Sequence, residues 1–370
     1  MLKSLARRTL AALFALCRVF PVRKNKAVLL RGFPHWGALE AMERALLADG
    51  RFRVVKIADW RRPGTLYHLA TAEMIFLNNN FSPLAHLKFS KKTKLVQLWH
   101  GDGGWKRWGH SVSSGAADVS FGNSRTPSAP KIPYDYAICN CESVRPFWAE
   151  AFALPEARVL PLGSPRLDAL TRPYDKQALR MKLDAQYPQC RGKKLMLYAP
   201  TFRENPEENR ALLSHFDFDA FQERFGQEAA LLLRLHPKMH GQYDLGNADV
   251  IDLTGQPDQD NLMRVIDLLI TDYCSLCFDA VALDIPVLIY AFDEASYMNK
   301  DRGFYKPLRE LPPGPIANDF PALLAHLAAP DAYAEQRAAF AAFHLGAVDG
   351  GACGRIISML EKGLAIHPGK

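Results

Sequence analysis

No apolar run in this sequence reaches the roughly 18 residues that a helix needs to span a bilayer. Cysteine is scarce: the seven thiols are odd in number and widely spaced, which excludes a disulfide framework and favours a reducing compartment. Cys274 and Cys277 form a single C-x-x-C, and no second pair stands at the spacing of a zinc site. We therefore expect neither a disulfide-stapled domain nor a metal centre.

Several motifs of enzyme chemistry are also missing. Residues 101–104 read Gly-Asp-Gly-Gly, but Lys106 occupies the last glycine position of a dinucleotide fingerprint, and neither a P-loop nor G-x-S-x-G is present. Asp217 and Asp219 match a D-x-D metal motif, although helix capping accounts for them better. The basic and aromatic residues 105–108 are an isolated spot rather than a stripe, so we expect no nucleic acid partner.

The sequence is rich in hydrophobic residues and carries a net positive charge. Of its 370 residues, 48% are hydrophobic and 23% are charged, which is typical of a well-buried globular protein of two domains. The formal net charge of +7 and the pI near 9.0 favour an anionic partner. Charge alone does not choose among a membrane surface, a nucleotide, a phosphorylated polymer and a nucleic acid.

The first 20 residues combine leucines at helical spacing with basic residues. This pattern predicts an amphipathic helix that lies on the cytoplasmic face of an anionic membrane. A buried structural helix and a signal peptide are the alternatives, although basic residues resume at Arg18 and no A-x-A cleavage site follows. The residues expected to meet the membrane are Lys3, Arg7, Arg8, Leu13, Phe14 and Arg18.

Short apolar runs alternate with helix-like segments along the rest of the chain. Continuously apolar strands of this kind are typical of parallel sheets that helices cover on both faces. A polar break at 173–192 separates two series of such runs. Strands are expected at 26–32, 52–57, 73–79, 94–101, 134–140 and 158–163, and then at 194–201, 229–237, 249–254, 267–272 and 286–292.

The pattern predicts an α/β protein of two Rossmann-like, doubly wound domains that face a cleft, preceded by the amphipathic helix. The expected segments are the helix at 1–20, an N-terminal domain at 21–180, a C-terminal domain at 181–335, and a final helical part at 336–370 that packs back on the first domain.

Ligands of such sheets bind beyond the carboxyl ends of the strands, so the polar residues there are the candidates. His100 follows a strand and has glycines beside it, which suits a general base; an ordinary turn histidine is the alternative. Arg234 and His236 lie on one face of a strand, where they hold phosphate oxygens or form a structural pair. At an expected helix start, Ser275 holds a pyrophosphate, or Ser275 or Asp272 caps the helix.

Taken in order, these motifs resemble the CDP-glycerol glycerophosphotransferase family of teichoic-acid and capsule polymer synthesis. The resemblance runs from about Val19 to Leu360, and the last four of its ordered blocks form a specific signal by their spacing. The blocks are VFPVRKNKAVLL, LWHGDGGWKRWG, LGSPRLDAL, LMLYAPTFRE, LRLHPKM, LLITDYCSLCFDAVAL, PVLIYAFDEASYMNKDRGFY and DGGACGRI.

The resemblance implies a glycosyltransferase-B type fold with an acceptor domain followed by a CDP-donor-binding domain. It implies transfer of glycerol phosphate, or a related alditol phosphate, from a CDP-linked donor with release of CMP. His100 is then the catalytic base and His236 a second essential histidine at the donor phosphates. The donor-binding positions implied are Gly101, Asp102, Arg166, Pro200, Thr201, Arg234, Leu235, Cys274, Ser275, Asp279 and Arg302.

The resemblance also implies the partners and the location. The partners are a CDP-alditol donor, a lipid-linked or polymeric glycan acceptor and an anionic membrane surface, at the cytoplasmic face of the bacterial cell membrane. No cofactor is implied, and a divalent metal is not required where fixed cations supply the charge.

Two motifs depart from the family pattern. Asp102 and Gly103 replace the Thr-Pro that usually follows His-Gly, and Cys274 replaces the first serine of a pair. Asp102 brings negative charge near an anionic donor unless it orients His100 or meets acceptor hydroxyls. These departures keep two alternatives open: a nucleotide-sugar glycosyltransferase of the same fold, and a catalytically inactive scaffold of a polymer-synthesis complex.

Overall fold

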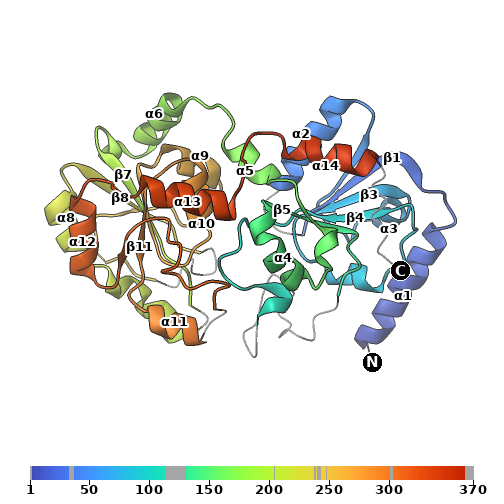
Figure 1. The fold of residues 1–370 in the computed structure, drawn as a ribbon, viewed down its shortest axis with the longest axis horizontal. Coiled ribbons are helices and arrows are strands. Elements are labelled where there is room, and N and C mark those ends of the chain that lie inside the picture. The colour runs from blue at the N-terminus through green and yellow to red at the C-terminus, as the bar shows by residue number, and fades with distance from the viewer. Residues whose placement is uncertain are drawn as a thin grey trace. The chain divides into compact units, whose positions relative to one another are not determined.

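The computed structural model describes residues 2–32, 37–112, 131–203, 205–236, 239, 243–246, 248–300 and 303–362. The chain divides into two compact units, drawn in Figure 1: unit 1 comprises Met1–Ala169 and His344–Lys370, and unit 2 comprises Leu170–Phe343. Within the described ranges, no helix is both long enough and apolar enough to cross a membrane.

Unit 1 is built on a parallel sheet of six strands in the order β2-β1-β3-β4-β5-β6. In register, Val28 of β1 lies beside Val55 of β2 and Ile75 of β3. The order reverses between β1 and β3, and such a switch point leaves a ligand-binding crevice at the carboxyl ends of the two strands. The strands are β1 (Arg23–Leu30), β2 (Arg53–Ile57), β3 (Ala72–Leu77), β4 (Lys94–Gln97), β5 (Tyr136–Cys139) and β6 (Val159–Pro161).

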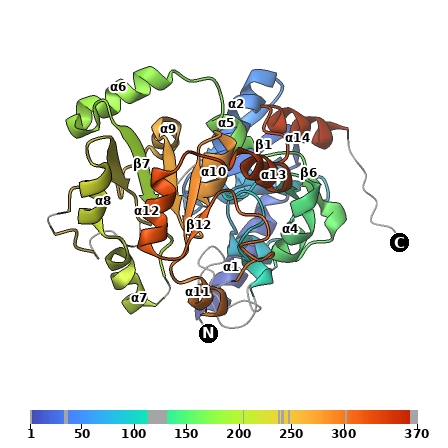
Figure 2. The same ribbon diagram turned by 60° about the vertical axis from the view of Figure 1, so that its left-hand side comes forward.

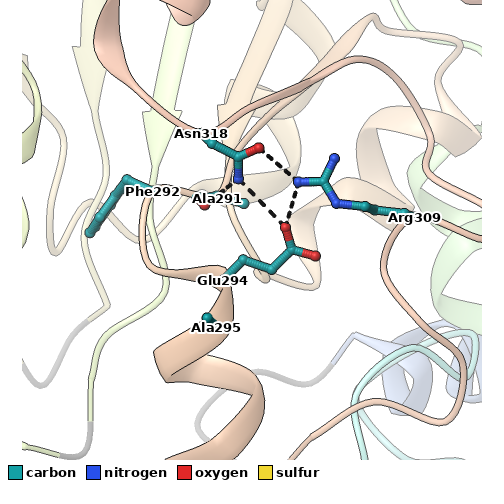
Figure 3. Close-up of a pocket in the computed structure, with 6 residues that line it drawn as sticks. All are labelled: Ala291, Phe292, Glu294, Ala295, Arg309 and Asn318. Atoms are coloured by element: carbon teal, nitrogen blue, oxygen red, sulfur yellow. Dashed lines mark hydrogen bonds and ion pairs between the residues drawn. The ribbon is translucent and has the colours of Figure 1, made fainter.

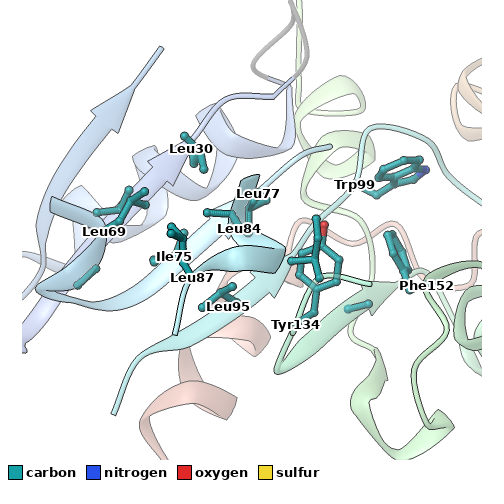
Figure 4. Packing of buried hydrophobic residues seen from close by; sticks show 14 of the residues in the cluster. Leu30, Leu69, Ile75, Leu77, Leu84, Leu87, Leu95, Trp99, Tyr134 and Phe152 are labelled. Atoms are coloured by element: carbon teal, nitrogen blue, oxygen red, sulfur yellow. The ribbon is translucent and has the colours of Figure 1, made fainter. Parts of the chain in front are cut away.

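Alternating side chains of the strands feed two separate cores on the two faces of this sheet. Val28 and Leu30 point into one core, part of which Figure 4 shows, and Ala27 and Leu29 point into the other. The first core is covered by α1 (Leu2–Cys17), α3 (Thr65–Ala70), α4 (Arg145–Phe152) and the 3-10 turn η1 (Ser82–His86). The second is covered by α2 (Ala38–Asp49) and α14 (Ala352–Glu361), which lie side by side in Figure 1. The remaining elements are α5 (Pro165–Leu170), η2 (Gly109–Ser111), η4 (Glu142–Val144) and η5 (Glu156–Arg158).

Unit 2 has a parallel sheet in the order β12-β11-β10-β7-β8-β9, which is the Rossmann strand order. Ile270 of β10 lies beside Tyr198 of β7 and Leu288 of β11. The switch point is therefore between β7 and β10. The strands are β7 (Lys194–Ala199), β8 (Ala229–Leu233), β9 (Ile251–Asp252), β10 (Leu268–Thr271), β11 (Val287–Tyr290) and β12 (Ile316–Ala317).

The helices of unit 2 connect and cover these strands. Phe221 of α8 and Leu323 of α12 are fully buried in one core cluster, and α6 lies beside α9, as Figure 2 shows. The helices are α6 (Lys176–Gln186), α7 (Pro206–Ala211), α8 (Phe218–Phe225), α9 (Gln259–Val265), α10 (Leu276–Ala282), α11 (Glu294–Lys300), α12 (Phe320–Ala328) and α13 (Ala334–His344), with the 3-10 turns η6 (Pro188–Cys190) and η7 (Leu212–His215). Asp217 caps α8 through a hydrogen bond from the Ala220 amide, as the capping interpretation expects.

The two sheets confirm the prediction of two Rossmann-like, doubly wound domains. Most strands are shorter than predicted. For example, β4 ends at Gln97 and β8 at Leu233, because the apolar pattern continues into buried residues that have left the ladder. The two-residue strand β12 was not predicted, since so short a segment carries no periodic signal. The unit boundary at Ala169 differs from the composition break, because α6 packs with α9 of unit 2.

Helix α1 has two faces. Phe14 is 1% exposed and meets the Phe89 ring at 5.0 Å, so the prediction that Phe14 contacts a membrane is wrong. Leu5, Leu13 and Leu16 are 65%, 49% and 66% exposed, and Arg7, Arg8 and Arg18 are exposed as well. The side chain of Lys3 lies outside the described part of the structure. The helix is therefore both a structural element of unit 1 and a carrier of exposed leucines.

Candidate active-site residues

His100 lies just beyond β4, next to the switch point of unit 1, and is half-buried. Its Nδ1 is 3.0 Å from the carbonyl oxygen of Asn78, the first residue after β3. A carbonyl can only accept a hydrogen bond, so Nδ1 carries the ring proton and the lone pair of the neutral ring is on Nε2. In this tautomer Nε2 is the ring atom with the chemistry of a proton acceptor.

Near His100, hydrogen bonds join the residues that follow β1 to those that follow β3. The amide of Gly32 donates to Asn78 Oδ1 at 3.1 Å, and the Asn79 side-chain amide donates to the Gly32 carbonyl at 3.1 Å. A Cβ on Gly32 would lie 2.9 Å from the Cβ of Asn79. Only glycine permits this approach, which brings the carboxyl ends of the two strands together.

Trp99, the residue before His100, has a left-handed backbone with φ of 61°. This conformation costs a bulky residue about 1–3 kcal/mol and persists only where the surroundings impose it. Here the indole stacks on Trp108 at 4.7 Å and meets the edge of Phe152 at 5.3 Å, and Figure 4 shows Trp99 beside Phe152. The aromatic cluster therefore holds the turn from which His100 projects.

The structure pairs two predicted donor-binding residues with each other. Asp102 is buried, and its carboxylate accepts hydrogen bonds from Arg166 Nε at 2.8 Å, from Arg166 Nη2 and from the Asn140 side chain at 3.1 Å. Asn140 in turn accepts from the Gly103 amide at 3.0 Å. Asp102 thus anchors the loop that follows His100, and its charge is neutralised by Arg166. Gly101, between the two, is half-buried.

In unit 2, the switch point lies between β7 and β10, and a predicted turn follows each of these strands. Asp272 joins the two turns. Its Oδ1 accepts from the Thr201 amide at 2.8 Å, and its Oδ2 accepts from Arg203 Nη2 at 2.9 Å. Arg203 also donates to Asp293 at 2.7 Å from a side chain that is only 1% exposed. Burial opposes the charge of Arg203, but Asp272 and Asp293 outweigh it and raise the pKa of the guanidinium. Asp272 therefore joins the turns after β7 and β10 and is not the cap of α10.

Arg234, Leu235 and His236 lie beyond the end of β8. The Arg234 guanidinium is half-buried and donates to the Leu253 carbonyl at 3.2 Å. Burial lowers the pKa of Arg234, and this effect is only partly offset by Cys274 and Asp258. Leu235 is buried, whereas His236 is exposed with its ring 4.6 Å from that of Phe202. Arg234 and His236 therefore lie just beyond the strand rather than on it, with the buried Leu235 between them.

The other predicted donor residues of unit 2 differ in their surroundings. Ser275 is exposed at the N-cap of α10 and makes no side-chain capping bond. The half-buried Cys274 lies in the same turn as Ser275, and the buried Pro200 lies in the same turn as Thr201. The hydroxyl of Thr201 is buried and has no hydrogen-bond partner within the described residues. Asp279 is buried in the first turn of α10, where Gln259 donates to it at 3.4 Å. Arg302 is outside the described residues.

A surface pocket of about 460 Å³ in unit 2 contains none of these residues. Figure 3 shows that Arg309 donates to Glu294 and Asn318, while Asn318 donates to the Ala291 carbonyl. These polar groups satisfy one another, so the pocket offers no chemistry of its own. In the described ranges, no three His, Cys, Asp or Glu side chains gather as a metal site.

Sequence reasoning missed the polar residues that hold the candidates in place. In unit 1 these are Asn78, Gln97 and Asn140, and in unit 2 they are Arg203 and Asp293. Asn78 and Asn140 directly follow a strand, and Asp293 comes three residues after the end of β11. The positional rule that identified His100 would have found these three residues only if the strand ends were known to within two residues.

Known proteins resemble this chain in sequence and fold. Residues 51–362 match the model of the family CDP-Glycerol:Poly(glycerophosphate) glycerophosphotransferase. A teichoic acid ribitol-phosphate primase of Bacillus spizizenii is 35% identical over 269 residues, covering 70% of this chain and 67% of the relative. The teichoic acid ribitol-phosphate polymerase TarK of Staphylococcus aureus is 30% identical over 314 residues, covering 81% and 59%.

In fold, a solved structure of the wall teichoic acid polymerase TagF matches with a TM-score of 0.76 at 23% identity, covering 98% of this chain and 95% of that chain. The chain spans between about half and two thirds of the length of the first three relatives. The family match covers most of the sequence and both units. The chain therefore belongs to the CDP-glycerol:poly(glycerophosphate) glycerophosphotransferase family.

Proposed function

We propose that this protein transfers an alditol phosphate from a CDP-linked donor to a hydroxyl of a teichoic-acid acceptor and releases CMP. The observation that carries the proposal is the half-buried guanidinium of Arg234 beyond β8 of unit 2, near Cys274 at the switch-point turns. A half-buried guanidinium in such surroundings is stabilised by an anion such as a pyrophosphate. The buried Thr201 hydroxyl in the same group of turns has a hydrogen bond to offer.

The reaction needs one proton acceptor and several cationic or hydrogen-bonding groups. The acceptor hydroxyl attacks the β-phosphorus in line, the bond between that phosphorus and the bridging oxygen breaks, and CMP leaves with the bond's electrons. His100 Nε2 takes the hydroxyl proton, in the tautomer that Asn78 imposes. Arg234, His236 and Ser275 meet the charge that develops on the transferred group and on CMP.

The alditol is either glycerol or ribitol. The names of the relatives support both: the Bacillus spizizenii ribitol-phosphate primase is 35% identical, and a teichoic acid glycerol-phosphate primase of Bacillus subtilis is 27% identical over 271 residues. We expect turnover with CDP-ribitol to be at least as fast as with CDP-glycerol, since the identity to the ribitol enzyme is higher.

The fixed cations also bear on the need for a metal. We propose that Arg234 and His236 supply the charge that a divalent ion supplies in other phosphoryl transferases. CMP release in the presence of excess EDTA then equals that without it. A loss of activity that Mg²⁺ restores would overturn this part of the proposal.

We further propose that unit 1 docks on the cytoplasmic surface of an anionic membrane through α1. Leu5, Leu13 and Leu16 offer exposed apolar area, and the neighbouring Arg7, Arg8 and Arg18 offer charge. This combination suits shallow insertion between lipid headgroups. A lipid-linked acceptor would be presented at that surface.

The deciding experiment incubates the protein with CDP-glycerol, CDP-ribitol, CDP-glucose and UDP-N-acetylglucosamine, each with a teichoic-acid primer, and measures CMP and UMP or UDP release. The proposal expects CMP from a CDP-alditol, transfer of label to the primer, and loss of both in His100→Ala. Release of a nucleoside diphosphate from a nucleotide sugar would support the glycosyltransferase alternative. No release from any donor, with the primer bound, would support the scaffold.

A further inference from the structure

Gln97 is the last residue of β4 and is fully buried, although its side chain is polar. Its Oε1 accepts a hydrogen bond from the Trp99 amide at 2.9 Å. Its Nε2 donates to the Asn79 carbonyl at 3.0 Å and to the Tyr134 hydroxyl at 2.9 Å. All the hydrogen-bonding capacity that a buried amide must satisfy is thus directed at residues around His100.

The two ends of the Gln97 amide each hold one of the two groups that meet in the hydrogen bond between His100 and Asn78. Trp99 precedes His100, so its amide sets where the imidazole starts. Asn79 follows Asn78, so its carbonyl sets where the acceptor of the His100 Nδ1 proton lies. The rigid, planar amide of Gln97 therefore fixes the position of His100 relative to the Asn78 carbonyl, and that carbonyl selects the tautomer of His100.

Tyr134 extends the same network. Its hydroxyl accepts from Gln97 and donates to Asn80 Oδ1 at 3.0 Å, and its ring is buried in the core cluster shown in Figure 4. The segment 78–80 is therefore held from two directions, by Gln97 and by Tyr134. The left-handed backbone of Trp99 needs such support, because the conformation is unfavourable for a tryptophan.

We propose that Gln97 is a positioning residue, which keeps His100 in the tautomer with the proton on Nδ1 and aims Nε2 at the acceptor hydroxyl. This inference rests on the proposed function, in which His100 is the base. Because Gln97 is fully buried, it acts through Trp99, Asn79 and Tyr134 rather than by contact with substrate. Small misplacements of a catalytic group cost large factors in rate, so the effect on turnover is measurable.

The test compares Gln97→Leu with Thr93→Val. Leucine matches glutamine in size but makes none of the three hydrogen bonds. Thr93 precedes β4, is buried, and donates to the Ala72 carbonyl at 2.7 Å, so its valine variant also loses one buried hydrogen bond but leaves the His100 turn intact. Tyr134→Phe removes only the bridging hydroxyl and serves if Gln97→Leu does not fold.

Two readouts separate positioning from general destabilisation. In Gln97→Leu we expect kcat for CMP release to fall by about 10- to 100-fold, with KM for the CDP-alditol within about threefold, because the donor groups are on unit 2. The ¹⁵N chemical shifts of His100 should move from the Nδ1–H tautomer towards a mixture. Tyr134→Phe should show the same changes at smaller amplitude, and Thr93→Val neither.

The inference is overturned if folded Gln97→Leu or Tyr134→Phe keeps both the wild-type kcat and the His100 tautomer, or if Thr93→Val loses as much activity. If the wild-type protein releases no CMP, the proposed function fails. The ¹⁵N measurement then still decides whether Gln97 sets the tautomer, because it needs no substrate.

Discussion

At the scale of single residues, Asp102 and Arg166 show how a buried charge depends on its partner. The Asp102 side chain is 3% exposed, and its carboxylate is held by two nitrogens of Arg166 and by Asn140. A carboxylate near His100 repels an anionic donor only if its charge is uncompensated. Here the guanidinium cancels that charge, which explains how Asp102 stands near His100 without opposing an anion.

Removing Arg166 should therefore leave a buried, unpaired carboxylate. We expect Arg166→Met to lower the free energy of unfolding by about 3 kcal/mol, and the double variant Asp102→Asn/Arg166→Met to recover part of the loss. Arg107→Met is the control, because the Arg107–Glu150 pair of the same unit is exposed and is worth less than about 1 kcal/mol. Urea denaturation measures all three, and equal losses in Arg166→Met and Arg107→Met would contradict the pairing argument.

Lys26 gives a pH dependence with a definite sign. It is buried, donates to Thr71 Oγ1 at 2.6 Å and lies 5.0 Å from the Tyr67 ring centre. Burial, with the neighbouring charges of Arg23 and Arg53, lowers its pKa from 10.5 to about 8. Between these two values the unfolded chain holds more protons than the folded chain, so the contribution of Lys26 to stability rises with pH across that window.

The measurement is urea denaturation between pH 7.5 and pH 10 for wild type, Lys26→Met and the exposed control Lys92→Met. Wild type and Lys92→Met should gain stability relative to Lys26→Met as the pH rises, because only Lys26→Met lacks the titrating ammonium. Parallel curves for all three proteins would show that Lys26 has an ordinary pKa.

At the scale of elements, helix α1 has apolar residues on two faces, one packed on the core of unit 1 and one exposed. Leu10, Phe14 and Cys17 pack on the core of unit 1, while Leu5, Leu13 and Leu16 stay exposed. Helical spacing marked the leucines, but it could not tell which apolar stripe faces the sheet. Deleting the whole helix would uncover the core, so point substitutions on the exposed face are the better test.

We expect Leu13→Glu/Leu16→Glu to weaken binding to anionic vesicles at least tenfold, with the free energy of unfolding within about 0.5 kcal/mol of wild type. Leu47→Glu, on α2 of the same unit and 57% exposed, is the matched control and should bind as wild type does. Vesicle co-sedimentation measures binding. Unchanged binding of the double variant would rule out α1 as the docking surface.

At the scale of the whole molecule, His100 and His236 belong to different units. His100 is beside the switch point of unit 1, and His236 is beyond β8 of unit 2. If unit 1 supplies the base and unit 2 holds the donor, the two histidines should affect different kinetic parameters.

His100→Ala should lower kcat for CMP release by about 10²- to 10⁴-fold and leave the Kd for CDP within about threefold. His236→Ala should weaken CDP binding as well as turnover, by about tenfold each. His86→Ala, in η1, is the control and should change neither. Calorimetric titration with CDP and the CMP assay give both quantities, and near-normal turnover of His100→Ala would refute its assignment as base.

The sequence by itself determined the two α/β domains, eleven of the strands and the turns in which candidates lie, because hydrophobic periodicity is a local property that survives without knowledge of the fold. The tertiary structure alone decided which candidates meet. Asp102 and Arg166 are 64 residues apart, and Arg203 and Asp293 are 90 apart. Their pairing depends on strand order, which no local pattern encodes. In the same way, His100 was visible in the sequence, but its tautomer follows from a contact with Asn78, which lies just after the neighbouring strand β3.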